Sequence, residues 1–136
     1  MALLHRAPSL RRLPPGIVAS RRLADMALLR LFSRARRRGT PLLLARLARS
    51  GRSGGELPEE FLLGLAAGVR IGDLVWFEPG AEILLLLEDA EDGTAVQARL
   101  QERARQLGVE LDWHSAQFPR HGLSLDALLE KVRWRP

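Results

Sequence analysis

The stretch Arg70–Glu88, RIGDLVWFEPGAEILLLLE, decides the fold of this chain. It contains two apolar runs, and the Pro79-Gly80 pair between them is typical of a turn that joins adjacent strands. The sequence therefore predicts a β-hairpin, with strands over 73–77 and 82–88.

Periodic patterns on both sides of the hairpin predict further elements. Apolar residues at helical spacing, followed by stop signals such as Gly39 and Gly108, predict helices, and short apolar runs predict strands. The predicted helices cover 21–38, 58–69, 92–107 and 125–132, and the other predicted strands cover 41–47 and 110–117. This order predicts an α/β sandwich in which a mainly antiparallel four-stranded sheet is packed with helices, in a ferredoxin-like or cyclase-like arrangement.

The length of 136 residues is that of one ordinary domain. Three prolines interrupt residues 1–20, so we expect an irregular basic arm there and one domain over 21–136. No apolar run approaches the roughly 20 residues of a membrane helix, and no secretory signal is recognisable. Together with the absence of cysteine, these features predict a soluble protein of a reducing cytoplasm.

Charge is divided unevenly along the chain. Residues 1–55 hold 13 Arg and one Asp, a net charge of +12, whereas residues 56–136 hold 8 basic and 15 acidic residues, a net charge of −7. Such a basic half can meet nucleic acid or an anionic membrane. However, Phe32 is the sole aromatic residue before position 56, whereas proteins that bind single strands interleave aromatics with basic residues. A solvated basic face is therefore favoured over a nucleic-acid surface, and the three scattered histidines predict no metal site.

The pattern Arg-x-x-Asp occurs twice, at Arg22–Asp25 and at Arg70–Asp73. The pattern is short, so only its context can give it meaning. The second copy is separated by the five residues Leu74–Glu78 from the segment Pro79–Ile83. The first copy has no such neighbour and is interpreted as an ordinary helix pair.

With these motifs on it, the chain resembles a shortened and degenerate GGDEF domain, the fold of the bacterial diguanylate cyclases that make cyclic di-GMP. The resemblance covers about residues 16–133. Ser20-Arg21-Arg22 is similar to the family's Asn-Arg-Arg, and Phe118-Pro119 with Gly122 is similar to the family's turn before its penultimate helix. In the family an Arg-x-x-Asp site stands five residues before the Gly-Gly-Asp/Glu-Glu-Phe signature, so the resemblance implies that Arg70 and Asp73 bind cyclic di-GMP.

The same resemblance implies that catalysis has been lost. The signature corresponds here to Pro79–Ile83, with Ala81 at its acidic position, and the family's Asp-x-Asp at the end of the first strand corresponds to Ala45-Arg46-Leu47. Two-metal phosphoryl transfer needs those carboxylates to hold Mg²⁺. We therefore expect no enzyme activity and no cofactor, and we expect Glu82 to be a strand carboxylate that faces water.

The side-chain chemistry of the pair suits guanine. An arginine can donate to O6 and N7 of guanine, and a carboxylate can accept from its N1–H and amino groups. Arg103 lies in Gln101–Arg105, which resembles the family's Ala-Glu-Arg-x-Arg, so the resemblance implies a third ligand contact there. The alternatives are a helix-end salt bridge for Arg70 and Asp73, worth under about 1 kcal/mol, and a solvated Arg103.

The expected function is that of a catalytically inactive cyclic di-GMP receptor domain. It resembles the receptor domains of exopolysaccharide secretion regulators of the cellulose and Pel types, which implies a protein partner in such a system. The alternative is a ligand-free interaction scaffold, derived from a decayed GGDEF fold, that docks through its basic arm or first helix.

Overall fold

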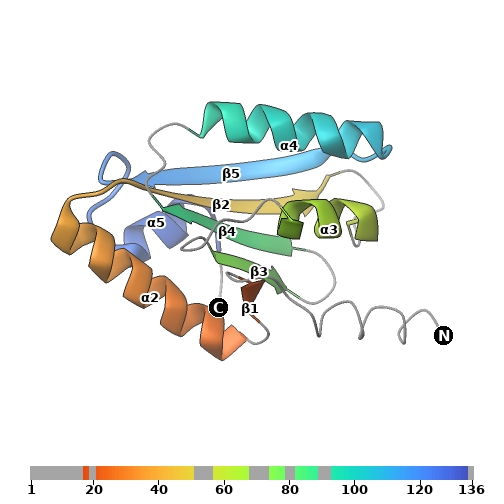
Figure 1. Cartoon of the computed structure of the whole chain (residues 1–136). Helices are drawn as coiled ribbons and strands as arrows, with labels where there is room; N and C mark the ends of the chain where they lie inside the picture. The colour runs from red at the N-terminus through yellow and green to blue at the C-terminus, as the bar shows by residue number, and fades with distance from the viewer. Residues whose placement is uncertain are drawn as a thin grey trace.

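The computed structural model describes residues 17–18, 21–50, 57–67, 74–78, 82–88 and 93–134. Figure 1 shows the helices α2 (Arg21–Arg38), α3 (Glu59–Ala67), α4 (Thr94–Gln106) and α5 (Leu125–Lys131) around one sheet. The strands are β1 (Ile17–Val18), β2 (Leu42–Arg49), β3 (Leu74–Glu78), β4 (Glu82–Glu88) and β5 (Leu111–Phe118). Within these residues, no helix is long and apolar enough to cross a membrane.

The sheet has the strand order β1-β3-β4-β2-β5. The neighbours from β3 to β5 are all antiparallel, and β1 adds a short parallel pairing in which Ile17 lies opposite Val75 and Val18 opposite Trp76. The predicted α/β sandwich with four antiparallel strands is therefore confirmed. No local pattern predicts β1, because two residues are too few to carry a strand signal.

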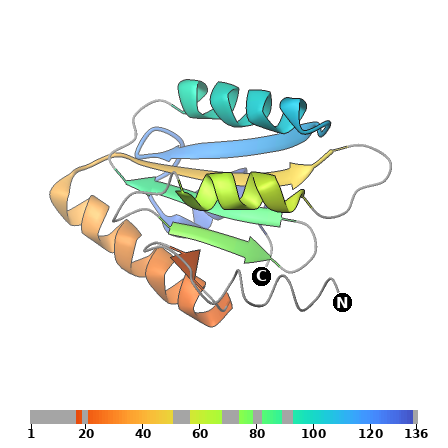
Figure 2. The same cartoon turned by 45° about the vertical axis from the view of Figure 1, so that its right-hand side comes forward.

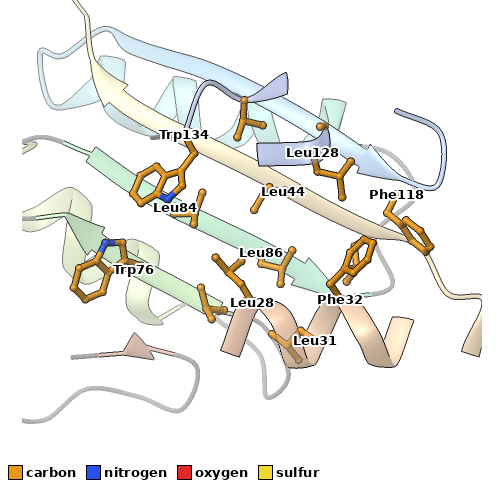
Figure 3. Close-up of a cluster of buried hydrophobic side chains, with 14 of the residues drawn as sticks. Leu28, Leu31, Phe32, Leu44, Trp76, Leu84, Leu86, Phe118, Leu128 and Trp134 are labelled. Atoms are coloured by element: carbon orange, nitrogen blue, oxygen red, sulfur yellow. The ribbon is translucent and has the colours of Figure 1, made fainter. Parts of the chain in front are cut away.

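Helices cover both faces of the sheet. The first hydrophobic cluster joins α2 and α5 to one face, and the second joins α3 and α4 to the other. Figure 3 shows the first cluster, in which the rings of Phe32 and Phe118 meet edge to face with centroids 5.0 Å apart. Because both faces are covered, Ile83–Leu86 are all buried, and their unbroken apolar run replaces the alternation of a half-exposed strand.

Most of the predicted element boundaries lie close to the observed ones. Helix α2 ends as predicted at Gly39, which has φ 68°, and the N–H of Thr40 donates to the carbonyl of Ala35 at 3.0 Å. Strand β2 extends two residues beyond the predicted end at Leu47, because Ala48 still pairs with both neighbouring strands. Helix α5 begins at Leu125 and is capped by Ser124, whose hydroxyl accepts from the N–H of Ala127 at 3.1 Å.

Candidate functional site

Arg103, the third predicted ligand contact, lies on α4 with an exposed side chain. Its guanidinium reaches across to α3 and lies against Gly64. A Cβ added to Gly64 would be 2.5 Å from Cζ and 2.6 Å from Nε of Arg103, a distance that real side chains do not adopt. A residue without a side chain at position 64 is therefore what allows the two helices to hold the guanidinium in this place.

The position of Gly64 relates Arg103 to the predicted pair. Gly64 lies in the last turn of α3, which ends at Ala67, and residues 68–73 connect α3 to β3. Arg70 and Asp73 belong to this connection and lie outside the described residues. The carbonyl end of a helix attracts positive charge, so the guanidinium of Arg103 is placed favourably beside the last turn of α3.

The neighbouring arginines of α4 differ from Arg103. Arg105 pairs with Glu102 at 2.5 Å on an exposed side of the helix. Arg99 is exposed one turn before Arg103, and the three atoms nearest to a Cβ added at Gly64 all belong to Arg103.

The other Arg-x-x-Asp copy is far from this place in the fold. Arg22 and Asp25 are exposed on α2, and α2 packs on the face of the sheet opposite to α3 and α4. Figures 1 and 2 show this separation from two directions. The interpretation of Arg22–Asp25 as an ordinary helix segment therefore fits its position.

The hairpin end lies beside the second half of β2. Glu78 pairs with Glu82 across the connection 79–81, and Glu82 in turn pairs with Ala48 of β2. The segment Ala45–Leu47, to which the resemblance assigns the metal carboxylates, therefore lies within β2 and next to Ile83–Leu85. It does not lie at the strand end, because the strand continues to Arg49.

Arg46 is an unusual residue in this otherwise apolar part of the strand. Its side chain is 12% exposed, and it donates from Nη1 to Oε1 of Glu82 at 2.9 Å and from Nε to the carbonyl oxygen of Val132 at 2.8 Å. A buried charge needs such partners, since burial without them is costly. Arg46 thus connects the hairpin end to the turn that follows α5.

The expectation that Glu82 is a strand carboxylate that faces water leaves out its ion pair with β2. The Glu82 side chain is only 35% exposed, and its carboxylate is paired with Arg46. Glu82 lies two residues from Leu84, the direct partner of Arg46 across the strands, so the contact is the diagonal kind. The presence of Arg46 in an apolar strand was a signal that an acidic partner had to lie nearby.

The flanking residues of Arg46 point to the opposite face of the sheet. Ala45 and Leu47 are fully buried in the cluster formed with α3 and α4. In the part of the chain that the structure describes, no group of three or more His, Asp or Glu residues could hold a metal ion.

The described histidines have local structural contacts. The ring Nδ1 of His121 accepts from the N–H of Gln117 at 2.9 Å and so closes the turn after β5. Nε2 of His114 lies 3.4 Å from Oδ2 of Asp112, two residues away on the same strand. Both contacts are local to the strand β5 or to the turn that follows it.

No protein-family model matches the sequence, and no curated protein matches it. Solved structures do match the fold. A diguanylate cyclase protein from Thermotoga maritima is similar with a TM-score of 0.70 and 14% identity, covering 89% of this chain and 95% of that one.

Two further solved structures agree with this match. The GGDEF domain of YfiN (TpbB) from Pseudomonas aeruginosa has a TM-score of 0.58 and 20% identity, with 90% of this chain and 86% of that chain covered. A sensory box/GGDEF family protein from Caulobacter crescentus has a TM-score of 0.57 and 15% identity, with 83% and 86% covered. The chain therefore has the fold of GGDEF domains.

Proposed function

We propose that this chain is a cyclic di-GMP receptor domain without cyclase activity, which passes its signal to a protein partner in bacterial exopolysaccharide production. Arg70 and Asp73 recognise guanine, and Arg103 supplies a further cation. The observation that carries the proposal is the position of the Arg103 guanidinium against Gly64, in the last turn of the helix that leads into Arg70 and Asp73.

This position matters because the ligand combines guanine bases with two phosphates. One arginine and one carboxylate can address the edge of a guanine, whereas the phosphates require positive charge. Arg103 comes from a different element than Arg70 and Asp73. The proposal thus assigns the guanine contacts and the further cation to different parts of the chain.

The loss of cyclase activity is supported at the hairpin end. The residues at the positions that the resemblance assigns to metal binding are Ala45, Leu47 and Ala81. The carboxylate of Glu82 is already paired with Arg46. A lone, neutralised carboxylate cannot offset the charge of two divalent ions.

Calorimetric titration with cyclic di-GMP tests the proposal. We expect micromolar or tighter binding that is lost in Arg70→Ala and Asp73→Ala and weakened in Arg103→Ala. Arg99→Ala removes an exposed arginine of the same helix and is the matched control, which should bind as the parent chain does. Incubation with GTP and Mg²⁺ should give no cyclic di-GMP.

Tight binding that survives both Arg70→Ala and Asp73→Ala would refute the assignment of the pair. Absence of heat with the parent chain would favour the ligand-free scaffold instead. Formation of cyclic di-GMP from GTP would refute the loss of cyclase activity but would not contradict the proposal that the chain binds cyclic di-GMP.

A further inference from the structure

The outward side of α2 carries large apolar side chains that the fold does not bury. Leu23, Met26 and Leu29 are 50%, 59% and 59% exposed. Their spacing of three residues places them along one side of the helix over two turns. The inward side of α2 packs into the first cluster, and the outward residues add nothing to this core. The buried residues of the inward side are Ala24, Leu28, Leu31, Phe32 and Ala35.

Arginines share this outward side. Arg22, Arg30, Arg36, Arg37 and Arg38 are all exposed. Within the described residues, Arg30, Arg37 and Arg38 take part in no ion pair or side-chain hydrogen bond, whereas Arg34, nearer the sheet, pairs with Glu88 at 2.8 Å. The helix contains seven Arg and one Asp, so its surface has a strong positive potential.

The combination of exposed apolar and unpaired basic groups restricts the kind of partner. Nucleic acid offers phosphates but no apolar surface for the exposed Leu and Met side chains. No aromatic residue, on which a base could stack, is among the exposed large hydrophobics of the described residues. An acidic protein would need a groove for this convex helix and a carboxylate opposite each unpaired arginine. An anionic bilayer supplies mobile negative charges at its surface and an apolar interior beneath them.

We propose that the outward side of α2 docks on an anionic membrane surface, with Leu23, Met26 and Leu29 entering the acyl boundary and the surrounding arginines meeting lipid phosphates. This binding is peripheral, since no described helix is able to span a bilayer. It is independent of the proposed cyclic di-GMP site.

The arrangement of the layers permits both surfaces to be used at once. Helix α2 packs on one face of the sheet, and the contact of Arg103 with Gly64 lies between α3 and α4 on the other. Figures 1 and 2 show α2 at the outside of the molecule and away from α3 and α4. A domain that docks through α2 keeps the α3 and α4 side toward the aqueous phase.

Cosedimentation of the full chain with lipid vesicles tests the proposal. The chain should bind vesicles of phosphatidylcholine and phosphatidylglycerol in equal parts, bind more weakly as salt rises, and ignore vesicles of phosphatidylcholine alone. Each arginine near an anionic surface contributes about fivefold in affinity, so Arg30→Gln/Arg37→Gln should weaken binding by about 30-fold. Met26→Ser/Leu29→Ser should weaken it by at least about tenfold.

The matched control is Arg99→Gln/Arg120→Gln, which removes two exposed arginines outside α2 and should change binding less than about twofold. All substituted positions are exposed, and circular dichroism should show the parent spectrum for every variant. Equal loss in the control, or full binding by Met26→Ser/Leu29→Ser, would overturn the proposal. The proposal would also be overturned if the chain does not bind anionic vesicles but binds a leucine- and glutamate-rich amphipathic peptide, or duplex DNA, through the same residues.

Discussion

The Arg46 side chain connects β2 to the hairpin end and to the turn after α5. Replacing Arg46 by Met removes every hydrogen-bond donor of this side chain but keeps an unbranched side chain of similar length. Val132 is fully buried, and its carbonyl oxygen would lose the Nε of Arg46 at 2.8 Å. A buried acceptor left without a donor costs about 1–3 kcal/mol. The ion pair with the partly exposed Glu82 adds up to about 1 kcal/mol.

We therefore expect Arg46→Met to lower the free energy of unfolding by about 2–3 kcal/mol. This is a large fraction of the roughly 5–15 kcal/mol that stabilises a domain. Urea denaturation followed by circular dichroism measures the change, provided that the slope against urea concentration stays constant. Glu82→Gln should cost about 1 kcal/mol or less, because it leaves the bond to Val132 intact.

Arg49→Met is the matched control. Arg49 lies on the same strand, is partly exposed, and has no ion pair or side-chain hydrogen bond among the described residues. Its replacement should change the free energy of unfolding by less than about 0.5 kcal/mol. If Arg46→Met costs no more than Arg49→Met, the reasoning from the buried carbonyl is refuted.

Two other substitutions have effects that follow from local geometry. Gly64→Ala should leave the free energy of unfolding unchanged or raise it by up to about 1 kcal/mol, because alanine has the higher helix propensity and the Arg103 guanidinium that it displaces is the flexible end of a side chain. The same substitution should weaken cyclic di-GMP binding in calorimetry. Undiminished affinity would show that Arg103 in this position is not part of the site. Arg133→Gly should raise the free energy of unfolding by about 1 kcal/mol in urea denaturation, because Arg133 has φ 62° after α5, where glycine is favoured; a loss of stability would contradict this.

Local patterns were sufficient for the main elements of the fold. The hairpin strands, the stop of α2 at Gly39 and the range of α5 each depend on neighbouring residues, and a periodic run of apolar residues with its stop signals carries that information. The ion pair of Glu82 was not predicted, because its partner Arg46 is 36 positions away in the sequence. Pairings over such distances leave no local periodicity.

In the candidate site, too, the local features could be predicted from the sequence and the contact between distant residues could not. The spacing between Arg70–Asp73 and the hairpin is visible in the sequence, as is the resemblance that draws attention to Arg103. The contact of Arg103 with Gly64 could not be predicted, because it depends on how closely α3 and α4 pack on the sheet. A lone glycine inside a short helix is the sequence signal for such a close approach.

The short strand β1 affects how the molecule can be shortened. It pairs with the outer side of β3 at Val75 and Trp76, where an edge strand would otherwise offer free backbone donors and acceptors to another molecule. A chain trimmed to begin at Arg21 would keep both hydrophobic clusters but would open this apolar edge to self-association. Fragments intended for binding or crystallisation should therefore retain Ile17 and Val18.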